Sequence, residues 1–76
     1  MKAQPNQRVR LRVDVHSGFD STVIPKGTFG WIVEAYERPR EGYAVDVEMP
    51  DDSLVGGFRF ENVILYPEQF DVVLTD

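Results

Sequence analysis

The sequence predicts an all-β fold, a small barrel of about five antiparallel strands. Short apolar segments alternate with polar residues, and glycine or proline separates these segments from one another. No long stretch has the periodicity of an amphipathic helix. With 76 residues and 42% hydrophobic content, the chain is expected to form one domain with a modest core.

The clearest strand pattern lies near the start of the chain, after a polar arm (residues 1–7) that we expect to be flexible. Val9, Leu11, Val13 and Val15 alternate with charged residues, which predicts a strand with one face on the core. Arg8, Arg10 and Arg12 share its other face. This arginine face could bind an anion or a nucleic acid, or it could be solvated and pair with acidic residues of a neighbouring strand.

The stretch 25–33 organises the next part of the fold, after a loop over residues 16–24. Pro25 suits the first central position of a turn, and Gly27 can supply the positive φ that a type II turn requires two residues into it. Gly30 lies inside the predicted strand 28–36, where a glycine indicates a bulge, a bend or a close backbone approach. A phosphate-binding loop is not favoured, because no helix N-terminus follows.

The remaining strands follow at close spacing. We predict a charged turn over 37–42, a strand over 43–49, a turn over 50–53 and a strand over 54–60 with a bulge at Gly56-Gly57. The short polar segment 61–63 is predicted to be a 3₁₀ turn before a last barrel strand over 64–66, which Pro67 ends. The tail, residues 68–76, is apolar enough to pair with a sheet edge, to pack as a short helix or to bind another copy of the chain.

Residues 8–67 carry a family resemblance on this pattern. The order Val9-x-Leu11, Pro25-Lys26-Gly27-Thr28-x-Gly30-x-Ile32-Val33-Glu34, Tyr43-x-Val45-x-Val47 and Glu61-Asn62-Val63 resembles a family of small bacterial proteins of unknown function. The resemblance implies an SH3-like barrel with a Pro-x-Gly-Thr-x-Gly core motif, and an inhibitor or immunity role. More distantly, residues 26–33 resemble the KOW element of ribosomal and transcription-elongation proteins, which implies RNA binding.

Composition argues against catalysis. The chain has no cysteine, which excludes a disulfide, a thiol nucleophile and a cysteine-based zinc site. His16 is the single histidine and lacks the base, orienting group and oxyanion site of a catalytic constellation. We therefore expect a non-enzymatic protein without cofactor or metal. No signal peptide or membrane-spanning run is present, so we expect a cytoplasmic protein that does not bind membranes.

Charge points to a protein partner. Residues 1–40 carry seven basic and four acidic side chains, whereas residues 41–76 carry one basic and nine acidic, for a net charge of −5. An acidic chain is a poor ligand for nucleic acid and suits either solubility or a basic protein partner. The sequence thus favours a protein-interaction module with an acidic binding face, and the alternative is a nucleic-acid or ribosome-binding module. The residues predicted for the acidic face are Glu34, Tyr36, Asp46, Glu48, Asp51 and Asp52, with Trp31, Tyr36 and Tyr43 as aromatic anchors.

Overall fold

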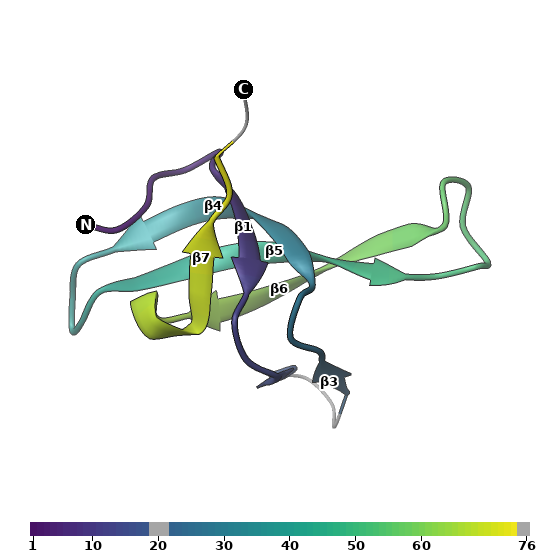
Figure 1. Cartoon of the computed structure of the whole chain (residues 1–76), viewed down its shortest axis with the longest axis horizontal. Helices are drawn as coiled ribbons and strands as arrows, with labels where there is room; N and C mark the ends of the chain where they lie inside the picture. The colour runs from purple at the N-terminus through teal and green to yellow at the C-terminus, as the bar shows by residue number, and fades with distance from the viewer. Residues whose placement is uncertain (19–21, 75–76) are drawn as a thin grey trace.

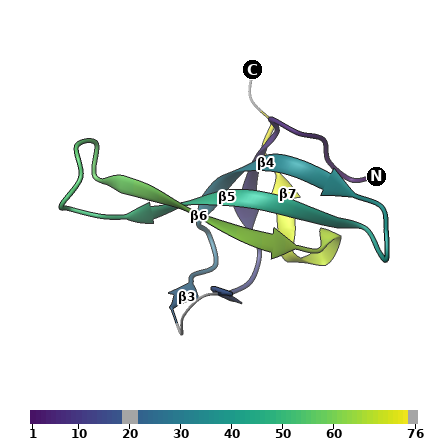
Figure 2. The same ribbon diagram turned by 180° about the vertical axis from the view of Figure 1, so that it is seen from behind.

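The computed structural model describes residues 1–18 and 22–74, and it is an all-β structure (Figures 1 and 2). Five antiparallel strands form one sheet, and two short strands form another. The larger sheet contains β1 (Arg8–Leu11), β4 (Phe29–Tyr36), β5 (Gly42–Pro50), β6 (Phe58–Leu65) and β7 (Phe70–Val72). The smaller sheet contains β2 (Val15–His16) and β3 (Val23–Ile24), and a 3₁₀ helix, η1, spans Pro67–Gln69.

The strand order of the larger sheet is β6-β5-β4-β1-β7, so the first strand lies between β4 and the last strand. Within the described residues no ladder joins β6 to β7, and the hydrogen-bonded sheet is therefore open at both of these strands. The β5–β6 hairpin is the longest pair, and its far half projects from the rest of the chain in Figures 1 and 2.

The core lies on one face of this sheet, here called the inner face. Along β1, β4 and β5, every second side chain points toward the inner face. Residues that are opposite each other on paired strands point to the same face, so the inward side chains of neighbouring strands meet. Ile24 from β3 joins this core. The fully buried side chains are Val9, Leu11, Ile24, Ile32, Tyr43, Val45, Val47, Leu65 and Phe70.

The turn before β4 has the chemistry that its sequence requires. The Thr28 backbone N–H donates to the Pro25 carbonyl (3.1 Å), and Gly27 has a φ of +92°. Gly30 permits a close approach of β5, because a Cβ at this position would lie 2.6 Å from the Asp46 carbonyl oxygen. The bulge in this ladder lies further on, between Ile32 and Glu34.

Two predicted boundaries are wrong. The first strand does not continue to residue 15: β1 ends at Leu11, the chain bends, and Val13 is exposed. The 3₁₀ turn is not at 61–63, because β5 is long enough to pair with β6 through Glu61, Asn62 and Val63. The 3₁₀ turn instead follows β6, with Pro67 at its first position and the Gln69 side chain accepting the Tyr66 N–H (2.8 Å).

The predicted strand 54–60 is also shorter than expected. Gly56 and Gly57 both have positive φ (92° and 77°), so they belong to the loop between β5 and β6 rather than to a bulged strand. The Asp51 N–H donates to the Gly57 carbonyl (2.8 Å), which closes this loop. The strand then begins at Phe58.

Both end segments contact the sheet. In the N-terminal arm, Ala3 is buried, and the Asn6 N–H donates to the Ile32 carbonyl (2.8 Å). The tail segment forms η1 and β7, which pairs with β1 and places Phe70 in the core. Leu74 is exposed, and residues 75–76 of the predicted tail lie outside the described residues, as do residues 19–21 of the predicted loop 16–24.

Candidate functional site

Around Glu48, the outer face of the sheet exposes four large aromatic side chains, here called the aromatic face: Phe29 and Trp31 on β4, and Phe58 and Phe60 on β6. Between 38% and 59% of each side chain's surface is accessible. They alternate with residues whose side chains point inward, which places all four on the same side. β5 lies between the two pairs, with Asp46 opposite Trp31 and Glu48 opposite Phe60.

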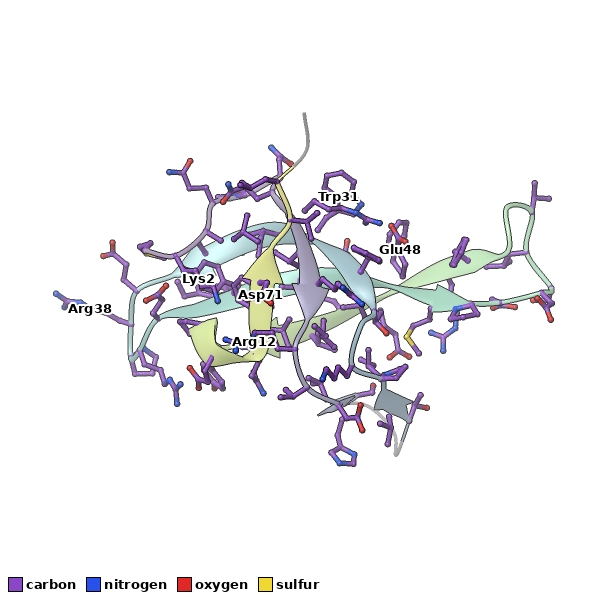
Figure 3. The ribbon with its side chains drawn as sticks, viewed as in Figure 1. Lys2, Arg12, Trp31, Arg38, Glu48 and Asp71 are labelled. Carbon is purple, nitrogen blue, oxygen red and sulfur yellow. The ribbon has the colours of Figure 1, made fainter. Side chains whose placement is uncertain are left out.

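Arg8 holds the β4 half of this face in place. Its guanidinium donates to Glu48 Oε1 (2.5 Å) and lies over two rings, 4.9 Å from the centre of Phe29 and 4.8 Å from that of Trp31. The Arg8 and Glu48 side chains are only 20% and 25% exposed, so solvent screens this pair less than a fully exposed one. Arg10 lies over the other side of the cluster, 5.6 Å from the Phe29 ring. Figure 3 shows Trp31 and Glu48, the two groups that Arg8 joins.

An open groove continues the aromatic face toward the turn before β4. It has a volume of about 530 Å³, and its apolar walls are Phe29, Pro50 and Phe58. Arg10 and Lys26 line the same groove together with Glu48, so two cations and one carboxylate face it. A second hollow of about 310 Å³ shares these two cations and adds Arg12, which pairs with Asp71 at 3.7 Å. The three residues of the predicted arginine face are therefore in different situations: carboxylates pair with Arg8 and Arg12, whereas Arg10 lies beside the Phe29 ring.

The six residues of the predicted acidic face lie apart from one another. Asp46 and Glu48 lie two residues apart on β5, within the aromatic face, and Asp46 accepts a hydrogen bond from the Asn62 side chain (2.9 Å). Glu34 and Tyr36 are near the other end of β4. Their mutual hydrogen bond (3.0 Å) raises the pKa of Tyr36.

The other two predicted residues belong to the loop at the tip of the hairpin. Asp51 accepts hydrogen bonds from the backbone N–H and the hydroxyl of Ser53, at 3.0 and 2.6 Å, and these bonds lower the pKa of Asp51. Asp52 is exposed beside it. Asp51 thus shapes the turn, and Asp46 and Glu48 are the predicted residues that lie within the aromatic face as defined above.

One predicted anchor is a core residue. Tyr43 is fully buried, packs edge-on against Phe70 with ring centres 5.3 Å apart, and donates its hydroxyl proton to Glu41. Burial raises the pKa of Tyr43, and the hydrogen bond to Glu41 raises it further. Conversely, the sequence interpretation missed Phe58 and Phe60 as surface residues. Their alternation with Arg59 and Glu61 is a signal for one shared face, although it does not say which face is covered.

The described residues contain no group of three histidine, cysteine, aspartate or glutamate side chains that could hold a metal ion. His16 is exposed on β2. In the part of the chain that the structure describes, no helix is long and apolar enough to cross a membrane. No protein-family model, no curated protein and no solved structure matches this chain. The candidate site is therefore defined by its geometry alone, as an aromatic face with fixed cations beside it.

Proposed function

We propose that this chain is a non-catalytic protein-binding module built as an SH3-like barrel. The fold part of the proposal is supported by the 3₁₀ turn directly before the last strand, and by the pairing of that strand with the first. The resemblance of residues 8–67 to small SH3-like bacterial proteins supports it independently. Fold alone does not give a function, so the binding role depends on the surface.

The observation that carries the binding role is the aromatic face. Aromatic and arginine side chains are enriched in protein interfaces and dominate their binding energy, whereas single apolar residues on a surface need no explanation. Here four exposed aromatic rings gather on one side of one sheet, and Arg8 is already ordered between two of them. Little side-chain entropy remains to be lost when a partner covers this part of the face.

The partner that fits best is a basic protein surface with an apolar centre. Asp46 supplies a carboxylate within the aromatic face, because its only hydrogen bond given by the structure comes from a neutral amide. The net charge of −5 attracts a basic partner at long range. The inhibitor or immunity role that the family resemblance implies belongs to this class of protein. Compared with the sequence hypothesis, the binding residues shift from the dispersed acidic set to Trp31, Phe60, Asp46 and their neighbours.

A nucleic-acid-binding role is the second candidate, and one observation favours it. Arginine guanidinium groups beside exposed aromatic rings are the combination on which unpaired bases stack. However, Glu48 neutralises Arg8, and Asp46 would repel a phosphate backbone that crossed the face. The protein-binding proposal therefore has more support.

The experiment is a capture measurement with a matched pair of variants. The immobilised chain is incubated with a lysate of its own organism, and retained proteins are quantified for the wild type, Trp31→Ala and Val23→Ala. Val23 is as exposed as Trp31 but lies on β3, away from the aromatic face. We expect Trp31→Ala to weaken retention of the specific partner roughly 30-fold, as for an interface hot spot, and Val23→Ala to leave it unchanged.

The same preparations are titrated with single-stranded RNA at low salt, followed by fluorescence anisotropy. Salt-dependent RNA binding that Arg10→Ala weakens would replace the protein-binding proposal with the nucleic-acid one. Retention of the same proteins by Trp31→Ala and the wild type would also contradict the proposal. Thermal melts of each variant show whether the fold is intact.

A further inference from the structure

We infer that two copies of this chain pair through the open edges of their β6 strands, in an antiparallel register centred on Phe60. The occupant of this edge is thus a second copy of the chain. The inference can be tested separately from the proposed function, because the test variants change the inner-face residues Arg59 and Glu61 and leave the rings of the aromatic face unchanged.

β6 is an edge strand of the large sheet. It has eight residues without a proline, and within the described residues no strand pairs with its outer side. Natural proteins usually shorten such edges, bulge them, interrupt them with proline or point charged residues inward. β6 has inward charges of both signs, Arg59 and Glu61, which oppose pairing in registers that bring like charges together. The other edge strand, β7, has only three residues and follows Pro67 closely. The first half of β6 also projects, together with its partner β5, beyond the other strands in Figures 1 and 2.

The ladder pattern shows which backbone groups this edge offers. Asp51 and Gly57 are opposite each other and joined by a hydrogen bond, and hydrogen-bonded pairs alternate with non-bonded pairs along an antiparallel ladder. Arg59 and Glu61 are therefore in the pairs bonded to β5. Phe58, Phe60 and Asn62 direct their backbone N–H and C=O groups away from β5, toward the open edge.

Several registers keep the inner faces of the two copies on the same side of the joined sheet. Among those centred on Arg59, Phe60 or Glu61, the charges of Arg59 and Glu61 favour the register centred on Phe60. With Phe60 opposite its own copy on the two-fold axis, each Arg59 lies opposite a Glu61 of the other copy. This is a non-hydrogen-bonded pair across the interface, the kind in which side chains approach most closely. The register one step away on either side places Arg59 opposite Arg59, or Glu61 opposite Glu61, and like charges directly opposite are destabilising.

The Arg59–Glu61 pair within each chain fits this arrangement. Arg59 donates to Glu61 Oε1 at 2.9 Å and lies 3.8 Å from Asp51 Oδ2. The second oxygen, Glu61 Oε2, is buried and has no hydrogen-bond partner among the described residues. A rotation of the carboxylate would let the guanidinium of the second copy supply the missing donor. Leaving such an oxygen unsatisfied costs free energy, so pairing gains from satisfying it.

The outer face gains as well. Phe60 would meet its symmetry copy, and Phe58 would lie opposite Asn62 of the other chain. More than half of each of these two aromatic side chains is exposed in the single chain. Aromatic cross-strand pairs of this kind stabilise a sheet. The result would be one ten-stranded antiparallel sheet in which the two aromatic faces are continuous.

The test is a charge-swap experiment followed by sedimentation velocity over a concentration series. We expect the wild type to form dimers as concentration rises. Arg59→Glu and Glu61→Arg each place like charges opposite each other twice, so each should raise the Kd of the dimer roughly tenfold or more. The double variant Arg59→Glu/Glu61→Arg restores opposite charges and should dimerise like the wild type.

Mixing the two single variants separates pairing from folding. The Arg59→Glu variant has acidic residues at both positions 59 and 61, and the Glu61→Arg variant has basic residues at both. Each homodimer therefore brings like charges together, whereas the heterodimer places two acidic side chains opposite two basic ones. The mixture should therefore form dimers that neither variant forms alone, which a folding defect could not produce. The inference would be overturned if the wild type stayed monomeric at all concentrations. It would also be overturned if the dimer Kd were the same for the wild type, Arg59→Glu and Glu61→Arg. Neither result depends on whether a heterologous protein binds the aromatic face.

Discussion

The two faces of the large sheet carry aromatic side chains in opposite situations. On the inner face, Tyr43 and Phe70 are fully buried and pack edge to face. On the outer face, Phe58 and Phe60 leave more than half of their surface accessible, while the charged residues Arg59 and Glu61 point inward. Along β5, apolar side chains point to the inner face and charged side chains to the outer face. Along the first half of β6 this arrangement is reversed.

The reversal has a structural cause. The first half of β6 belongs to the projecting part of the hairpin, where its inner side faces Asp51 and Met49, and Met49 is one of the core residues with some remaining exposure. Ion pairs can be satisfied there with partial access to water. Alternation therefore tells which residues share a face, and the distance from the core determines whether that face is covered.

The largest expected effect is a phenylalanine truncation on the inner face. Phe70→Ala should lower the free energy of unfolding by about 3–5 kcal/mol, because it removes a fully buried ring and leaves a cavity beside Tyr43. Phe60→Ala, the same substitution on the outer face, should change it by less than about 0.5 kcal/mol at concentrations where the chain is monomeric. Urea denaturation measures both values. Similar losses for the two variants would mean that the two faces are not distinct.

A smaller effect is expected at the backbone between β4 and β5. Gly30→Ala should cost about 1–3 kcal/mol, because the added Cβ would come within 2.6 Å of the Asp46 carbonyl oxygen and 2.9 Å of Val45 Cγ1. Gly18→Ala is the control, since a Cβ there meets nothing within 4 Å. Its melting temperature should match that of the wild type. If Gly30→Ala had the same melting temperature as the wild type, β4 and β5 would not approach as closely at Gly30 as the structure shows.

The smallest effect concerns the polar group at the end of the inner face. The hydroxyl of Tyr43 and the backbone N–H of Lys2 donate to Glu41, and these hydrogen bonds lower the pKa of that carboxyl below its ordinary 4.5. A lowered pKa in the folded state means that the stabilisation is complete above pH 4.5 and is lost as the pH falls through the folded-state value.

Melting temperatures measured from neutral pH down to acid would check this behaviour. Glu41→Gln should melt lower than the wild type at neutral pH, and the gap should narrow as the pH falls. Glu37→Gln, an exposed neighbour in the turn before β5, is the matched control and should follow the wild type. A gap that stays constant with pH would assign the Glu41 effect to something other than its charge.

The elements that follow local rules could be predicted from the sequence. The alternation of β5 predicts its strand almost to the residue, and Pro25 with Gly27 predicts the turn before β4, where Gly27 has positive φ. The sequence pattern places the 3₁₀ turn too early, because Glu61 and Asn62 are polar. Their role becomes clear only through tertiary contacts, with Glu61 paired to Arg59 and Asn62 donating to Asp46. Pro67 was interpreted only as the end of a strand, although proline also favours the first position of a helical turn.

The candidate site depended on longer-range facts. Arg8 and Glu48 are 40 residues apart, and no local pattern indicates that they form an ion pair between two aromatic rings. The dispersal of the predicted acidic face has a similar origin. β4 and β5 run antiparallel, so Glu34 and Tyr36 lie opposite Ala44 and Gly42, at the end away from Glu48. Negative charges that look continuous in sequence are therefore spread along the sheet.

The position of β1 has a consequence for how the chain can be synthesised and folded. β1 is synthesised before β4, β5 and β6 but pairs with β7, which is synthesised after them, through the register Val9 to Val72 and Leu11 to Phe70. The Val73 N–H and the Arg8 carbonyl extend the same contact. Because closing so long a loop precedes the contacts that reward it, this pairing is expected to be a late event. Until β7 has been synthesised and has paired with β1, the place in the core that Phe70 occupies stays unfilled.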